Sequence, residues 1–265
     1  MAEPTFPSLL AEETRDSITE YLSTTFALAD DQARSAFDEF LRNPETGIFR
    51  GPYLKLRTPY QQVASSWTSP LDWLPKGFIP FQHQAQSFDR LSTRGRAAEP
   101  TIVTTGTGSG KTESFLIPLL DHAMRSVAKG EKGIKAIILY PMNALVTDQA
   151  RRLANYLHDD PKLSNVTAGV YIGGTGRQKV PTRNQLVDNR DVLRQNPPDI
   201  LLTNYKMLDL LLLRKDDSPL WENASTTLQY LVLDEFHTYD GAQGTDVAML
   251  IRRLARIFHA GRVLA

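Results

Sequence analysis

The sequence predicts an α/β domain with a parallel sheet covered by helices on both faces, preceded by a mainly helical extension. After residue 80, short β-branched runs alternate with helical segments, which is the order expected of such a sheet. Several of these runs, including 136–139 and 230–233, are apolar without alternation, as expected of strands buried on both faces. Before residue 45, apolar residues recur three and four positions apart, which indicates helices.

The N-terminal extension is predicted to contain helices and then an ordered connector. Asp30 and Asp31 provide a cap for a helix over 33–41, and Pro44 ends it because proline has no amide donor. Residues 44–80 are rich in proline, glycine and aromatic residues, and we expect the aromatic side chains to be buried. We therefore assign 1–78 to an accessory region and 79–265 to the main domain.

Within the main domain, each element is predicted from its periodicity and flanking residues. The predicted strands are 101–105, 136–140, 167–171, 200–203 and 228–234. The predicted helices are 82–91, 111–128, 144–157, 182–195, 205–213 and 244–258.

Composition excludes several classes of protein. The chain has no cysteine, so it has no disulfide, thiolate zinc site or cysteine-held iron–sulfur cluster. It has no apolar run of the roughly 20 residues that a transmembrane helix needs and no readable secretory signal, so we expect a cytoplasmic protein. Residues 1–75 carry six basic and eleven acidic residues, whereas 76–265 carry 24 and 19; the resulting excess of +5 is compatible with phosphate binding.

A glycine-rich loop between the first predicted strand and its helix has the features of a phosphate-binding loop. Glycines let the backbone approach phosphate closely, and amides at a helix start point toward it. Lysine would neutralise the β- and γ-phosphates and the following threonine would ligate Mg²⁺. A flexible turn is the simpler alternative, and the first position departs from the strict pattern. The candidate ATP-binding residues here are Thr105, Gly106, Thr107, Gly108, Ser109, Gly110, Lys111 and Thr112.

Two acids follow the apolar run 230–233. Asp234 would hold Mg²⁺, and Glu235 would orient the attacking water. Acids at the carboxyl end of a parallel strand lie where ligands bind in open α/β sheets. A pair of acids after a strand is often only the start of a loop, but together with Lys111 it indicates Mg²⁺–ATP hydrolysis.

With the sequence Asp234-Glu-Phe-His237, the chain resembles superfamily 2 DExH/DEAD-box helicases, and residues 105–113 resemble their motif I. Residues 140–149, 173–175 and 202–208 resemble motifs Ia, Ib and Ic, and 81–85 resemble the upstream glutamine motif. The resemblance implies a first RecA-like lobe over about 80–265. Residues 234–248 are similar to the branch containing mitomycin-repair-type helicases and DISARM-type anti-phage helicases.

The resemblance implies further roles. Gln84 would read adenine, Lys111, Asp234, Glu235 and His237 would form the catalytic set, and Thr112 and Asp234 would hold the metal. It implies single-stranded DNA as partner, although composition does not separate DNA from RNA. It also implies a second RecA-like lobe, which these 265 residues do not contain, so we expect weak ATP hydrolysis from this chain alone. The residues expected to bind nucleic acid are Pro141, Asn143, Gly173, Gly174, Thr203 and Asn204.

Three readings compete at this point. The first is an ATP-dependent DNA helicase or translocase lobe, and the second is a nucleotide- and nucleic-acid-binding module without turnover. The third, an unrelated P-loop NTPase, is disfavoured because Gln84 and the DExH sequence occur together. Thr203 and Asn204 would either contact phosphate or cap the next helix.

Overall fold

The computed structural model describes residues 6–49, 59–106, 108–174 and 176–258. Contacts divide the chain into two compact units, Met1–Pro59 and Tyr60–Ala265. None of the helices in the described ranges combines the length and apolar character that crossing a bilayer requires. The assignment of 1–78 as accessory and 79–265 as motor lobe stays a prediction.

The first unit is a pair of helices, α1 (Pro7–Thr25) and α2 (Asp31–Arg42), that contact each other. The predicted cap is confirmed, because the Asp30 carboxylate accepts a hydrogen bond of 2.8 Å from the Ala33 amide. An ion pair of 3.1 Å joins Arg42 of α2 to Asp16 of α1. The second helix therefore starts and ends where the local sequence places it.

The second unit is built on a parallel sheet in the order β2-β3-β1-β4. The strands are β1 (Ala136–Leu139), β2 (Ala168–Tyr171), β3 (Ile200–Thr203) and β4 (Tyr230–Leu233). β1 is buried throughout, which confirms the prediction drawn from its apolar run, whereas in β4 only Tyr230 and Leu231 are buried. β2 and β3 are buried throughout as well. All four carboxyl ends meet at one edge of the sheet, where ligands bind in folds of this class.

Helices connect these strands. The α-helices are α3 (Gln82–Leu91), α4 (Lys111–Ala128), α5 (Asn143–Asp159), α6 (Arg190–Gln195), α7 (Tyr205–Leu213), α8 (Ala224–Thr227) and α9 (Gly241–Ile257). Short 3₁₀ helices are η1 (Pro161–Leu163), η2 (Lys215–Trp221) and η3 (Phe236–Thr238). The bounds of α3, α4 and α7 are those that the sequence predicts.

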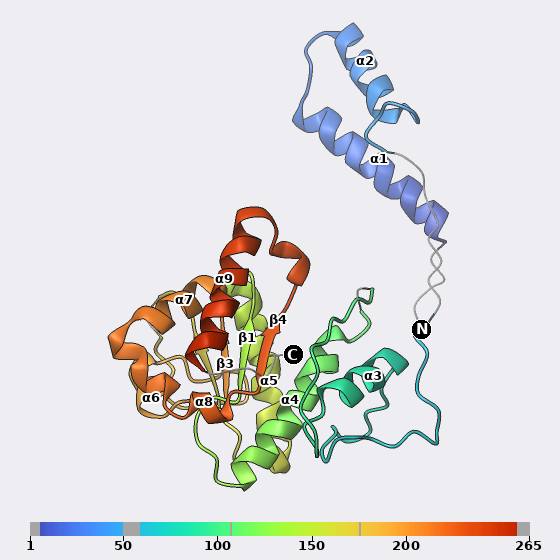
Figure 1. The fold of residues 1–265 in the computed structure, drawn as a ribbon. Helices are drawn as coiled ribbons and strands as arrows, with labels where there is room; N and C mark the ends of the chain where they lie inside the picture. The colour runs from blue at the N-terminus through green and yellow to red at the C-terminus, as the bar shows by residue number, and fades with distance from the viewer. Residues whose placement is uncertain (1–5, 50–58, 107, 175, 259–265) are drawn as a thin grey trace. The chain divides into compact units, whose positions relative to one another are not determined.

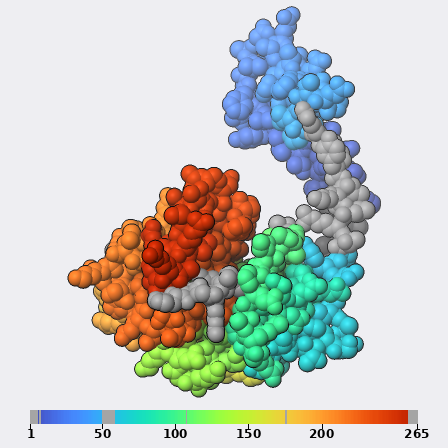
Figure 2. Space-filling view, in the orientation of Figure 1, coloured from blue at the N-terminus to red at the C-terminus, as the bar shows by residue number. Residues whose placement is uncertain are grey.

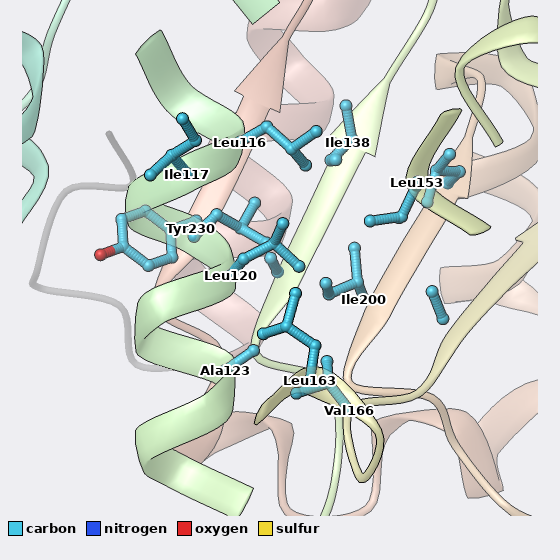
Figure 3. Packing of buried hydrophobic residues seen from close by; sticks show 14 of the residues in the cluster. Leu116, Ile117, Leu120, Ala123, Ile138, Leu153, Leu163, Val166, Ile200 and Tyr230 are labelled. Carbon is cyan, nitrogen blue, oxygen red and sulfur yellow. The ribbon is translucent and has the colours of Figure 1, made fainter. Parts of the chain in front are cut away.

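Two apolar layers enclose the sheet, and alternate strand residues face each layer. Figure 1 shows helices on both sides of the sheet. Side chains of α3, α4 and α5 pack on the face that carries Ile138 and Ile200; Figure 3 shows Leu116 and Leu120 of α4 pointing toward these two residues. The opposite face, with Ile137 and its neighbours, is covered by residues of α6, α7, α8 and α9. α7 and α9 contact each other, and the orange-to-red segments form a continuous surface in Figure 2. This confirms the predicted three-layer α/β fold.

The predicted strand 101–105 is wrong. These residues have no regular secondary structure and form no ladder with any described strand, and Ile102 is 80% exposed. β4 pairs only with β1 and ends the described sheet. A strand needs a neighbouring backbone to accept and donate its hydrogen bonds, and local β-branched composition does not supply one.

The predicted helix over 182–195 is also too long, since α6 covers only its last six residues. Val187 instead forms a parallel bridge to Gly169 at the edge of the sheet. The Asp188 carboxylate accepts a 2.6 Å hydrogen bond from the Gln178 amide. The Asn189 side chain then caps α6 by accepting from Val192 N, so tertiary contacts and a local cap displace the expected first turns.

A buried histidine predicts pH-dependent stability. Burial, followed by the charge of Arg125, lowers the pKa of His122 to about 4. The Thr93 hydroxyl accepts from Arg125 and lies 2.8 Å from His122 Nδ1, which suits a neutral ring accepting a hydrogen bond. The unfolded chain binds a proton at this histidine near pH 6.5. The neutral His122 ring therefore contributes fully to the free energy of unfolding above that pH, and this contribution is lost as the pH falls toward 4.

We therefore expect the free energy of unfolding to fall between pH 6.5 and 4 by roughly 3 kcal/mol from this group. Urea denaturation of the wild type and of His122→Gln at several pH values measures it. The variant should show a shallower pH dependence in this window. An unchanged slope would assign the acid sensitivity to other groups.

Candidate nucleotide and nucleic-acid sites

The glycine-rich loop leads directly into α4, as predicted. Gly108 and Gly110 have φ of +77° and +74°, a region that favours glycine. Gly110 precedes Lys111 without any side-chain cap, so the first amides of α4 are available to an anion. The Thr105 and Ser109 hydroxyls lie 2.6 Å apart and brace the loop. Thr107 lies outside the described residues.

α3 holds the loop in place through its first turn. The Gln84 amide nitrogen donates to the Gly110 carbonyl at 2.9 Å, and its oxygen accepts from the Phe81 amide at 2.9 Å. His83 Nε2 lies 3.0 Å from the Ser109 carbonyl. Gln84 is 2% exposed, so in this structure it connects the loop to α3, and adenine reading by Gln84 stays a prediction.

The structure adds an aromatic cluster that sequence reasoning did not assign to the site. Tyr60 packs on both Phe81 and His83, with ring centroids 5.6 Å apart in each case. A side chain at Gly106 would collide with the Tyr60 hydroxyl, so this cluster borders the phosphate-binding loop. Phe81 and His83 belong to the predicted glutamine motif, whereas Tyr60 lies in the aromatic-rich connector and had no predicted role.

The acids of the DExH sequence lie beyond β4. Burial, followed by the charge of Glu235, raises the pKa of Asp234, and the nearby Lys111 ammonium opposes the rise. The charge of Lys111 thus acts on Asp234, and their joint role in a nucleotide site stays a prediction. Glu235 has φ of +49°, an uncommon conformation for a residue other than glycine and one that often marks functional sites. His237 is exposed, with Nδ1 3.4 Å from Glu235 Oε2.

The residues expected to bind nucleic acid follow β1, β2 and β3 at the same edge. Asn204 Nδ2 donates to Asn143 Oδ1 at 2.8 Å, which joins two positions far apart in sequence. Asn204 also caps α7 by accepting from Met207 N at 2.8 Å, so the cap is confirmed and phosphate contact stays a prediction. Asn143, Gly173 and Gly174 are exposed and Pro141 is half-buried.

Thr203 occupies a different environment from its neighbours. It is fully buried, and its hydroxyl donates to the Tyr171 carbonyl at the end of β2. The side chain therefore links β3 to β2, beneath the exposed edge. This single contact separates Thr203 from Asn204, which the sequence alone treats as an equivalent pair.

Two basic side chains near this edge contact protein groups. Arg190 donates to the Gly174 carbonyl at 2.6 Å, and its guanidinium lies 5.4 Å from the centre of the Tyr171 ring. Arg194 pairs with the buried Asp217 at 2.7 Å. Arg190 therefore supports the glycine loop after β2, and Arg194 anchors α6 to η2.

The fold and the site define an α/β nucleotide-binding lobe with an anion-ready loop before α4 and paired acids directly after β4. The sequence profile of the DEAD/DEAH box helicase family matches residues 81–264. The chain belongs to this family, which confirms the resemblance seen in its motifs.

Known proteins agree with this assignment. Druantia protein DruE of Escherichia coli is 26% identical over 90% of this chain and 19% of its own length. The uncharacterized ATP-dependent helicase YprA of Bacillus subtilis is 32% identical over 67% of this chain and 20% of its own. The crystal structure of the DUF1998 helicase MrfA bound to DNA and AMPPNP matches with a TM-score of 0.51 at 30% identity, over 69% of this chain and 22% of that one. The chain thus spans about a fifth of these relatives.

Proposed function

We propose that this chain is the ATP-binding lobe of a helicase or translocase that couples Mg²⁺–ATP hydrolysis to movement on single-stranded DNA. The observation that carries the proposal is the shared carboxyl edge of the sheet, where Asp234 follows β4 and the hydrogen-bonded Asn143 and Asn204 follow β1 and β3. A nucleotide and a nucleic-acid strand would thus meet on neighbouring loops of one rigid sheet. YprA is named as an ATP-dependent helicase, and the MrfA structure contains DNA and AMPPNP.

The residues present fit a magnesium nucleotide. The Asp234 carboxylate and the Thr112 hydroxyl are hard oxygen donors, the kind that Mg²⁺ prefers. Asp234 is costly to ionise because of burial and the neighbouring Glu235, and a bound cation would offset that cost. Mg²⁺ would supply charge neutralisation between the phosphates. Lys111 would contact the phosphates, and Glu235 would orient the attacking water.

The exposed edge suits a phosphate backbone. Asn143 and Asn204 present amides, and Gly173 and Gly174 present an accessible backbone. These groups can bond phosphate oxygens, whereas reading base sequence needs side chains placed against base edges. We therefore expect binding that depends on salt and is nearly independent of sequence.

Fluorescence anisotropy with labelled single-stranded oligonucleotides of shuffled sequence tests this expectation. Affinity should fall as salt rises, with a shallow slope because few phosphates are contacted. The double variant Asn143→Ala/Asn204→Ser should weaken binding to all sequences by about tenfold or more, as lost hydrogen bonds to charged groups would. Serine at 204 keeps an oxygen to cap α7.

The matched control is Asn165→Ala, an exposed asparagine that precedes β2 and so lies at the amino-terminal edge of the sheet. It should bind as the wild type does. Strong preference for one sequence, or equal weakening by the control, would contradict a backbone track at the carboxyl edge.

A further inference from the structure

Two tyrosine rings connect the DExH segment to the nucleic-acid edge. Tyr205 and Tyr239 meet edge to face, with centroids 6.2 Å apart and ring planes at 85°. Tyr239 follows η3, five residues after Asp234, and Tyr205 opens α7 directly after Asn204. The contact therefore spans from the segment with the metal-binding acid to the helix start that carries the asparagine pair.

The Tyr239 hydroxyl is an unused donor in the same segment as this acid. The residue is 8% exposed, and its hydroxyl is buried without a hydrogen-bond partner in the described part of the chain. The charge of Asp234 and the proximity of Tyr205 contribute to raising the pKa of Tyr239, after burial itself. Buried hydroxyls are nearly always paired, so this group can accept a partner that a bound ligand supplies.

Tyr205 is held between the two sites. Its ring is half-buried and contacts Tyr239 on one side, while Lys206 Nζ lies 5.8 Å from the ring centre. The preceding Asn204 bonds both Asn143 and the first turn of α7. Any displacement of the Tyr205 ring therefore acts on the helix start that fixes the asparagine pair.

We propose that the Tyr239–Tyr205 contact couples nucleotide binding at Asp234 to nucleic-acid binding at Asn143 and Asn204. Both tyrosines are positioning residues. A nucleotide at Asp234 gives the Tyr239 hydroxyl a hydrogen-bond acceptor that it otherwise lacks, and the ring transmits this preference through Tyr205 to α7. Coupling of this kind needs a contact whose free energy differs between the two ligand states. The inference rests on the proposed function.

The experiment measures the affinity of the whole 265-residue chain for a labelled oligothymidylate with and without saturating Mg²⁺–AMPPNP. We expect the nucleotide to change the wild-type dissociation constant by about fivefold or more, the usual range for coupled sites. Tyr239→Phe, which removes only the hydroxyl, and Tyr205→Ala should both reduce the change to less than about twofold. Tyr205→Phe keeps the ring and should retain the wild-type change.

The oligonucleotide alone should bind both variants within about threefold of the wild type, because neither tyrosine touches it. The nucleotide alone should bind Tyr205→Ala as it binds the wild type, and Tyr239→Phe more weakly by the loss of one hydrogen bond. If circular dichroism shows that Tyr205→Ala does not fold, the coupling measured in Tyr239→Phe tests the proposal. A wild-type chain that binds both ligands without coupling would overturn this inference and leave the proposed function standing, and so would full coupling in Tyr239→Phe. A chain that binds neither ligand would overturn both.

Discussion

Replacing Lys111 by alanine is expected to weaken nucleotide binding strongly. Lys111 is the first residue of α4 and lies close enough to Asp234 to oppose the rise in its pKa. In the proposed site of the wild type, the Lys111 ammonium lies between the phosphates and the two acids. Without it, these negative groups repel one another. Charge-assisted hydrogen bonds contribute about 1.5–3 kcal/mol each, so affinity should fall roughly 10–100-fold. Titration with a fluorescent ATP analogue in Mg²⁺ measures the change.

Lys129→Ala is the matched control, since Lys129 is exposed at the opposite end of the same helix. This substitution removes the same charge at a position outside the phosphate-binding loop, so the variant should bind the ATP analogue with the affinity of the wild type. Equal binding by Lys111→Ala would contradict the assignment of this loop. Equal loss in both variants would indicate a general charge effect.

Replacing Asp199 by alanine is expected to destabilise the lobe by about 3–5 kcal/mol, the usual cost of breaking a buried ion pair. Lys135 is fully buried, and its ammonium donates to Asp199 at 2.6 Å and to the Glu131 carbonyl at 2.7 Å. The other Asp199 oxygen accepts from both the amide and the hydroxyl of Thr167. Alanine leaves all these donors short of a partner, at the amino ends of three strands.

Denaturant unfolding of Asp199→Ala and Asp159→Ala tests this expectation. Asp159 also pairs with an arginine, Arg183, but both side chains are about half exposed. Exposed pairs contribute about 0–1 kcal/mol, so Asp159→Ala should unfold nearly as the wild type does. If both variants lost a similar free energy of unfolding, burial would not be the reason why breaking the Asp199 ion pair is costly.

The local sequence predicted correctly those helices and strands whose ends are set by neighbouring residues. α2 begins at a capping aspartate and ends just before Asn43-Pro44, and α4 begins where the glycine loop ends. β1 and β3 were predictable because their runs are apolar on both faces. The helix predicted over 182–195 does not form before residue 190, because Val187 and Asp188 bond to residues elsewhere in the chain. A short window of sequence does not contain those partners.

The candidate site divides in the same way. Spacing alone predicted the phosphate-binding loop and the acids at 234 and 235, because loop chemistry depends on consecutive residues. The meeting of Asn143 with Asn204, and the border that Tyr60 forms beside Gly106, required the fold. So did the burial of Thr203, whose hydroxyl bonds β2.

The sequence by itself determined the fold class, the order of motifs and the family, because these depend on periodicity and on residues adjacent in the chain. Tertiary structure decided which polar groups stay available for ligands. A hydroxyl or guanidinium bonds whichever partner the packed sheet brings near it, as Arg190 does with Gly174. It also decided that 101–105 forms no strand in the described sheet, because a ladder requires a second backbone that local composition does not provide.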